Sequence, residues 1–227
     1  TSGLQAGNLI IVAGRPSMGK TSFALNIAQH AASKGGKVVC IFNLEMSREE
    51  LAKRILCSQA GVDMHKVNTG RTTDEELIEL SAALDEISSS NIYLDDTGGV
   101  TVADIRSRCR KLKTRVGLDL VIIDYLQLMD IGDSRDGRVA DIGKVTRALK
   151  VLARELDEPS VLLSQLSRAV ESRTSNEYRP VMADLRESGA IEQDADLIIL
   201  LYRRAVYADR LGIEPDGDNS AEVIIAK

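Results

Sequence analysis

Eight consecutive residues near the start of the chain have the types and the spacing of a phosphate-binding loop. Segment 14–21 matches the pattern G-x-x-x-x-G-K-[ST], whose glycines let the backbone curl so that successive N–H groups point at phosphate oxygens. A helix that begins near Gly19 would add the positive end of its dipole. We expect Lys20 to reach the β- and γ-phosphates of a nucleotide and the Thr21 hydroxyl to ligate Mg²⁺. The predicted nucleotide-binding residues of this loop are Gly14, Arg15, Pro16, Ser17, Met18, Gly19, Lys20 and Thr21.

A carboxylate that could complete a metal site ends the most apolar run of the chain. Asp124 follows the apolar residues 120–123 directly. Ligands of open α/β sheets collect at the carboxyl ends of the strands, so we expect Asp124 to hold Mg²⁺ directly or through water. An apolar run that ends in an acid is weak evidence alone, because any buried strand can end this way. Together with the phosphate-binding loop it predicts a metal site made by Thr21 and Asp124.

Hydrolysis also needs a group that positions or activates water. Glu45 lies just after the apolar run 37–42, where it could polarise the attacking water. The same position suits a glutamate that only favours the start of a helix. Gln165 lies just after the apolar run 161–163, where its amide could bond a γ-phosphate or could simply be a turn residue. From the residues alone both alternatives stay open at both positions.

These side chains each follow an apolar run, so the runs must lie side by side as strands. Apolar runs alternate with longer segments of helical periodicity, which predicts an α/β fold with a mostly parallel central sheet and helices on both faces. Two polar stretches, 130–138 and 167–180, are long enough to be functional loops. We predict strands at 9–13, 37–42, 92–94, 118–124, 161–163, 197–201 and 223–225, and helices at 20–32, 48–60, 73–87, 101–115 and 138–156.

Composition limits the remaining possibilities. The 227 residues are 44% hydrophobic and 28% charged, and no linker or repeat interrupts them, so we expect one domain over residues 1–227. A net charge of −5 argues mildly against a protein that coats nucleic acid with its whole surface, although a local basic groove remains compatible. Three scattered cysteines suit a reducing compartment. No apolar stretch has the length of a membrane span and no signal peptide opens the chain, so we expect a cytoplasmic protein.

Several fragments together resemble a known family. The phosphate-binding loop, LEM at 44–46, IDYLQL at 123–128, SQLSR at 164–168, DLRESG at 184–189 and IEQDAD at 191–196 occur in the order typical of the C-terminal domain of the DnaB replicative helicases. They cover nearly the whole chain, so the resemblance is far more specific than a lone phosphate-binding loop. It implies a RecA-like P-loop NTPase core that forms a homohexameric ring around single-stranded DNA. Such a ring hydrolyses ATP with Mg²⁺ to translocate and to unwind the duplex at the replication fork.

The resemblance also implies roles that the spacing left open. Glu45 matches the family's catalytic glutamate and Gln165 matches its γ-phosphate sensor, so that with Lys20 they form the implied catalytic set. Lys227 matches a lysine that one subunit supplies to the nucleotide of its neighbour. Without the family, the charged pair at 186–187 would be interpreted as a solvated turn. The residues that match the loop contacting the DNA backbone are Arg186, Glu187 and Gly189.

The chain also departs from the family's pattern. The family's N-terminal domain, its linker helix and the arginine finger that follows the residue matched by Lys227 are expected to be absent here. We therefore expect weak self-association and slow hydrolysis. Asn43, where the relatives usually have Ser, is expected to be neutral. Primase and a helicase loader are the further partners that the resemblance implies.

Two other functions remain to be compared with the helicase hypothesis. A RecA-type recombinase or a clock-like ring ATPase would share the phosphate-binding loop, Asp124 and a glutamate such as Glu45, but not segments 184–189 and 191–196. A P-loop kinase for a small molecule would need a lid and an acceptor pocket, which the sequence does not show.

Overall fold

A computed structural model describes residues 3–126, 129, 138–173, 177–211 and 220–227, without the side chains of residues 138, 139, 186–188, 209 and 210. Within this part of the chain, seven strands form one sheet in the order β3-β2-β4-β5-β1-β6-β7. Neighbouring strands are parallel except β6 and β7, which are antiparallel. The strands are β1 Leu9–Gly14, β2 Val39–Asn43, β3 Ile92–Asp95, β4 Leu120–Asp124, β5 Ser160–Gln165, β6 Leu197–Tyr202 and β7 Glu222–Ile225.

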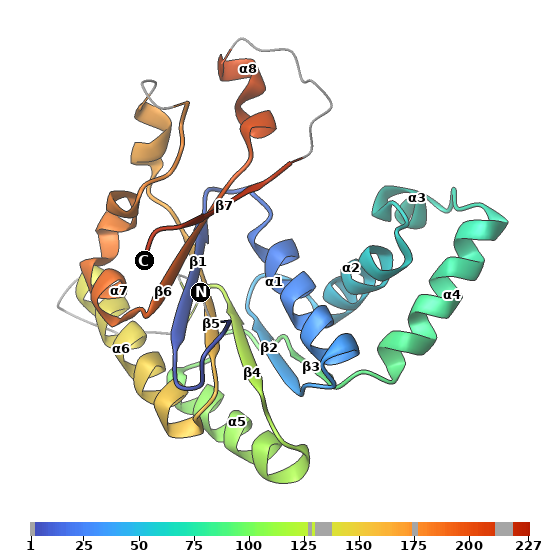
Figure 1. Ribbon diagram of the computed structural model, residues 1–227, viewed down its shortest axis with the longest axis horizontal. Coiled ribbons are helices and arrows are strands. Elements are labelled where there is room, and N and C mark those ends of the chain that lie inside the picture. The colour runs from blue at the N-terminus through green and yellow to red at the C-terminus, as the bar shows by residue number, and fades with distance from the viewer. Residues whose placement is uncertain (1–2, 127–128, 130–137, 174–176, 212–219) are drawn as a thin grey trace.

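Helices cover both faces of this sheet, as the alternating pattern predicted. Figure 1 shows α1, α2 and α4 on one side of the strands and α5, α6 and α7 on the other. Right-handed crossovers between parallel strands produce this arrangement, because the chain moves from β1 toward β3 over one face and returns over the other. The α-helices are α1 Lys20–Gln29, α2 Arg48–Ala60, α3 Met64–Thr69, α4 Asp74–Ser88, α5 Val102–Val116, α6 Arg138–Leu156, α7 Gly189–Asp194 and α8 Ala208–Leu211. Short 3₁₀ or π-helical elements are η1 His30–Lys34, η3 Arg168–Ser172, η4 Met182–Ser188 and η5 Arg204–Tyr207.

The central strands form the core and thereby fix the edge that carries the site. Every residue of β1, β2 and β4 is buried, because helices cover both faces of these strands. The edge strand β3 is only half-buried, and β7 alternates between half-buried and exposed residues. Strands packed on both sides hold their carboxyl ends in a fixed relation to one another. None of the helices in the described part of the chain is long and apolar enough to cross a membrane.

Helix α4 differs from the other predicted helices in how little of it is buried. Leu77 and Leu84, which periodicity places on one face, are 51% and 53% exposed, and Ile78 is 68% exposed. The helix packs on α2, Ala83 is buried, and the helix start is closed by a capping box between Thr73 and Glu76. Large apolar side chains gathered on one exposed helix are typical of a surface that another protein segment covers.

The polar stretch 130–138 lies almost entirely outside the described residues. In the second stretch, η3 occupies Arg168–Ser172 and residues 174–176 are outside the description. The short elements α3, α7, α8 and η4 were not predicted. The prediction that residues 1–227 form one domain stays a prediction.

Candidate nucleotide-binding site

Strand register brings the predicted residues to one edge of the sheet. Gly14 at the end of β1 lies beside Gln165 at the end of β5, and Asn43 at the end of β2 lies beside Asp124 at the end of β4. Parallel strands share their carboxyl edge, so residues far apart in sequence meet there. A cavity of about 350 Å³ opens at this edge. It is lined by Pro16, Ser17, Gly19, Lys20, Thr21, Ser22, Glu45, Met46, Arg54, Asp124, Tyr125 and Gln165.

The phosphate-binding loop has the backbone that its glycines predict. Gly19 has a φ of 86°, in the left-handed region, and directly precedes the first residue of α1. At Gly14 a Cβ atom would lie 3.3 Å from the carbonyl oxygen of Leu201, so a side chain would press on β6. Helix α1 therefore begins at the cavity, where the free N–H groups of its first turn are available to bind an anion.

Two side chains of the loop are turned away from the cavity. The buried Arg15 guanidinium donates to the Leu166 carbonyl oxygen at 2.9 Å and forms an ion pair with Glu171 at 2.7 Å. Met18 is also buried, and its sulfur accepts a hydrogen bond from the backbone N–H of Arg203 at 3.3 Å. These side chains hold the loop against the segments that follow β5 and β6. The side chains of Arg15 and Met18 therefore do not line the cavity.

Lys20 and the two carboxylates form the electrostatic centre of the cavity. Burial lowers the pKa of Lys20, and the nearby charges of Asp124 and Glu45 oppose that shift. The Lys20 amine donates to the Arg15 carbonyl oxygen at 3.3 Å. A partly buried ammonium beside free N–H groups is suited to binding the phosphates of a nucleotide.

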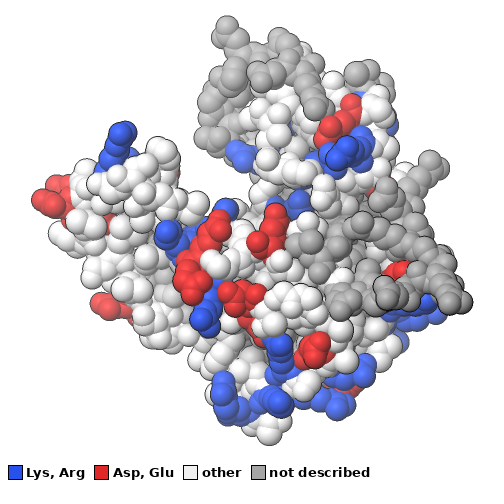
Figure 2. Space-filling model, turned by 180° about the vertical axis from the view of Figure 1, so that it is seen from behind, with Lys and Arg blue, Asp and Glu red and all other residues white. Residues whose placement is uncertain are grey.

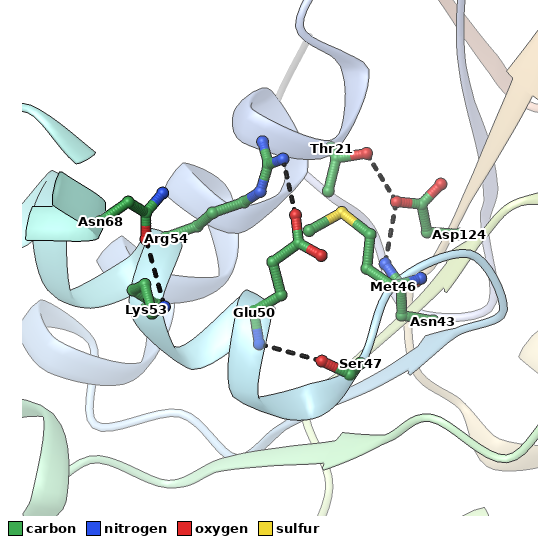
Figure 3. Close-up of polar contacts among 9 residues, drawn as sticks. All are labelled: Thr21, Asn43, Met46, Ser47, Glu50, Lys53, Arg54, Asn68 and Asp124. Atoms are coloured by element: carbon green, nitrogen blue, oxygen red, sulfur yellow. Dashed lines mark hydrogen bonds and ion pairs between the residues drawn. The ribbon is translucent and has the colours of Figure 1, made fainter. Parts of the chain in front are cut away.

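Thr21 and Asp124, the two residues predicted to share a metal, are in direct contact. The Thr21 hydroxyl donates to Asp124 Oδ2 at 2.7 Å, and Figure 3 shows the two side chains facing each other. Burial raises the pKa of Asp124, the Thr21 hydrogen bond lowers it, and the charge of Glu45 raises it again. No cluster of three or more His, Cys, Asp or Glu within the described residues could hold a metal. A hydroxyl and a carboxylate fit Mg²⁺, which needs few protein ligands when substrate phosphates and water complete its coordination.

Asn43 is a site residue that the sequence interpretation missed. Its side chain is 1% exposed and donates to Asp124 Oδ2 at 3.1 Å, while its amide oxygen accepts from the N–H groups of Glu45 at 2.9 Å and Met46 at 2.7 Å. It was expected to be neutral, but it joins the Asp124 carboxylate to the turn that carries Glu45, and Figure 3 shows its contact with Asp124. The signal that could have revealed it is an Asn at the end of a strand and before a turn, where the side chain accepts from N–H groups two and three residues later.

We predict that Asn43→Ala lowers kcat for ATP hydrolysis more than it weakens nucleotide binding. Losing the amide frees both Asp124 and the Glu45 turn, and a misplacement of about 1 Å can reduce a rate by up to about 10²-fold. Steady-state kinetics and nucleotide titration below the unfolding temperature separate kcat from affinity. Asn68→Ala is the matched control, since Asn68 is exposed and bonds to Lys53 on α2, outside the cavity lining. A kcat equal to that of the unchanged chain would show that Asn43 does not position the site.

Arg54 and Tyr125 also line the cavity without having been predicted. Arg54 comes from α2 and pairs with Glu50 one turn earlier, at 3.1 Å (Figure 3). Nothing in the sequence distinguished this pair from an ordinary exposed helix pair. Ser47 caps the same helix by accepting from the Glu50 N–H at 3.2 Å.

Lys227 lies at the opposite edge of the sheet from this cavity. It follows β7, which runs antiparallel to β6, so that its carbonyl oxygen accepts from Ile198 near the start of β6. Its amine donates to the carbonyl oxygens of Glu192 at 2.8 Å and Ala195 at 2.7 Å. Lys227 therefore does not join the cavity of its own chain.

The segment predicted to contact DNA lies beside the exit of β5. Arg186 and Glu187 belong to η4, but their side chains are outside the description, and the exposed Gly189 begins α7. The backbone N–H of Ser167, two residues after Gln165, donates to the Asp184 carbonyl oxygen at 3.1 Å. The start of this segment is thus fastened to the chain that leaves the cavity.

Comparisons with known proteins agree with the resemblance. A family model described as the DnaB-like helicase C terminal domain matches residues 1–227. The chain is 47% identical over 228 residues to the replicative DNA helicase DnaB of Geobacillus stearothermophilus, and 48% identical over 228 residues to the replicative DNA helicase DnaC of Bacillus subtilis (strain 168). Each alignment covers 100% of this chain and 49% of the relative. The chain therefore spans about half the length of the curated relatives it matches.

Two solved structures have the same fold. One, described as an ATPase domain, superimposes with a TM-score of 0.90 at 42% identity, covering 98% of this chain and 78% of that one. A DnaB-like replicative helicase, described with its interactions with primase, superimposes with a TM-score of 0.91 at 42% identity, covering 99% of this chain and 53% of that one. The expected RecA-like fold is confirmed, and the matches favour the helicase hypothesis over a recombinase or a clock-like ATPase. The chain belongs to the family of DnaB-like helicase C-terminal domains.

Proposed function

We propose that this chain is the ATP-hydrolysing motor domain of a replicative DNA helicase. The observation that carries the proposal is the convergence of Lys20, Thr21, Glu45, Asp124 and Gln165 around one cavity at the carboxyl edge of the sheet. Phosphoryl transfer to water needs backbone groups that bind the phosphates and a cation beside them. It also needs two oxygen ligands for a metal ion and a carboxylate that positions the attacking water.

Each residue then has a distinct task. The backbone of the loop 14–21 and the Lys20 amine bind the phosphates, and Thr21 with Asp124 would hold Mg²⁺, which neutralises phosphate charge when bound. Glu45, at the mouth of the cavity, orients the attacking water and accepts its proton. Gln165 supplies an uncharged amide that can bond the γ-phosphate. Asn43 holds the Asp124 carboxylate and the turn that carries Glu45 in fixed positions relative to each other.

We propose that nucleotide state reaches single-stranded DNA through the chain that leaves β5. Three observations support this path. Gln165 lines the cavity, and Arg15 bonds to Leu166 and Glu171 in the segment that follows. The backbone N–H of Ser167 donates to the Asp184 carbonyl oxygen. A change at the γ-phosphate is thereby linked within a few residues to the segment that carries Arg186. The proposed ligand of that segment is the DNA phosphate backbone.

The proposed working form is a homohexameric ring at the replication fork in the cytoplasm. Lys227 lies away from its own cavity, which supports a role toward the nucleotide of a neighbouring subunit. The exposed apolar residues of α4 offer a surface for another protein segment. Primase is a proposed partner, because a related structure is described with its primase interactions, and a helicase loader follows from the family resemblance.

The function is tested by ATP hydrolysis with and without single-stranded DNA, followed by strand displacement on a forked duplex by the protein in its full length. DNA-stimulated hydrolysis together with displacement of the paired strand is the expected result. Strand exchange between homologous DNA molecules without displacement at a fork would support a recombinase instead.

We predict that Arg186→Ala weakens binding of the assembled ring to single-stranded DNA by a similar factor for all base sequences. A guanidinium on the phosphate backbone contributes charge but reads no base. The slope of log affinity against log salt should fall by about one for each phosphate that is no longer neutralised. Fluorescence anisotropy with labelled oligodeoxynucleotides at several salt concentrations measures both quantities. Arg71→Ala, which removes an exposed charge from the α3–α4 turn, is the control, and an unchanged slope for Arg186→Ala would exclude this loop as the DNA-binding segment.

A further inference from the structure

A second hollow lies outside the nucleotide cavity, between the edge strand β3 and helix α5. Its volume is about 290 Å³, and it is lined by residues of β2, β3 and α5. Strand β3 is outermost at its end of the sheet, and no described strand pairs with its outer edge. The hollow is separate from the nucleotide cavity, since the two share no described residue.

The interior of this hollow is apolar. Phe42 of β2 and Leu112 of α5 are buried and form its floor. Tyr93 and Leu94 of β3 are half-buried and form a wall that still reaches solvent. A concave apolar surface with an aromatic wall is suited to enclosing one apolar side chain of a partner.

The rim of the hollow is cationic. Lys111 and Arg115, one helical turn apart on α5, are exposed and form no ion pair with any residue that the structure describes. They also line an adjoining hollow along α5. Figure 2 shows Lys and Arg side chains gathered at the bottom of the molecule, where α5 lies in Figure 1. The other cations of α5 are engaged, in the pairs Arg106–Glu155, Arg108–Asp95, Arg110–Glu155 and Lys113–Glu158.

We propose that this hollow binds an acidic peptide segment of another protein, which inserts one apolar side chain between β3 and α5. The charge is complementary to that of an acidic segment, because the exposed Lys111 and Arg115 flank the hollow. The outer edge of β3 lies beside the same hollow and offers backbone hydrogen bonds to an extended peptide. Nucleic acid fits less well, since only Lys111 and Arg115 among the cations of the lining lack an ion pair within the described residues, and affinity for phosphates needs a longer run of cations.

A labelled peptide tests the chemistry of the proposed ligand. The probe is a fluorescein-labelled peptide with one phenylalanine flanked by aspartates, titrated with the full chain and followed by fluorescence anisotropy. Replacing the phenylalanine with serine is expected to weaken binding roughly tenfold, because an anchor in the centre of an interface carries much of the affinity. Replacing the aspartates with lysines is expected to abolish binding. Equal binding of all three peptides would overturn the proposal.

Charge reversals in the protein test the location. Lys111→Glu and Arg115→Glu are each expected to weaken binding roughly three- to tenfold, since each loses an attraction and gains a repulsion at the surface. Tyr93→Ala should weaken it through the apolar wall. The matched control is Arg71→Glu, an equal change of charge on a distant exposed arginine, which should leave affinity unchanged. ATP hydrolysis should be unchanged in all these variants, and thermal unfolding verifies that each is folded.

Two outcomes would contradict this assignment. If Arg71→Glu weakens peptide binding as much as Lys111→Glu does, the attraction is general and the hollow is not a site. If a labelled oligothymidylate binds the unchanged chain more tightly than the acidic peptide and loses affinity in Lys111→Glu, the surface is a nucleic-acid contact instead.

Discussion

Replacing Glu45 with glutamine is expected to preserve nucleotide binding while lowering kcat by roughly 10²- to 10⁴-fold, the usual contribution of a general base. The amide keeps the size and much of the hydrogen bonding of the carboxylate, but it cannot accept the proton of the attacking water. The turn that carries Glu45 is held through its N–H by Asn43, so the substitution leaves the backbone in place. The loss therefore falls on the transition state rather than on the bound ground state.

The two effects are separated by measuring nucleotide affinity with a fluorescent ATP analogue and kcat by phosphate release. Glu49→Gln is the matched control, because Glu49 is exposed on α2, pairs with Arg48 and does not line the cavity. If Glu45→Gln hydrolyses ATP at the unchanged rate, Glu45 only favours the turn before α2 and the base lies elsewhere.

Much of the fold could be predicted because its strands are buried on both faces. An apolar run such as 120–123 has few places other than the centre of a parallel sheet, and the observed β4 ends at Asp124 as expected. The position of the site followed from the same pattern, since Gly14, Asp124 and Gln165 each end a central strand. Parallel packing then requires that they meet at one edge, where the structure places them.

Side-chain direction could not be predicted in the same way. Arg15 and Met18 stand inside the phosphate-binding pattern, yet each packs inward because the loop must be fastened to neighbouring strands. Asn43 was judged by residue type, whereas its role depends on lying beside Asp124 in the register of β2 and β4. The exposure of Leu77 and Leu84 likewise depends on what packs against α4, which periodicity does not report.

Arg15 illustrates how a residue of the motif can support the cavity without lining it. Its guanidinium is buried and bonds both Leu166 and Glu171, so it fastens loop 14–21 to the segment after Gln165. A buried charge of this kind is tolerated because it is paired and hydrogen-bonded. The cavity and the chain that leads to Asp184 are therefore connected through the contacts of Arg15 and Ser167.

Lys20→Ala is expected to lower kcat/KM for ATP by roughly 10²- to 10³-fold, the cost of removing one preorganised charge from a phosphoryl-transfer site. The Lys20 amine lies in the cavity, and no other lysine among the described residues lines it to replace its charge beside the phosphates. The fold should be retained, because the burial that lowers the pKa of this lysine offsets part of its attraction to Asp124 and Glu45, and its hydrogen bond to the Arg15 carbonyl oxygen is a single contact.

Nucleotide titration and phosphate release measure the loss, and thermal unfolding distinguishes it from a loss of structure. Lys34→Ala is the matched control, because Lys34 is an exposed lysine at the far end of the same helical segment and lies outside the cavity. A folded Lys20→Ala variant that hydrolyses ATP at the unchanged rate would show that the loop 14–21 is only a turn before α1. Such a result would place the nucleotide elsewhere, since Thr21, Glu45 and Asp124 are arranged around this amine.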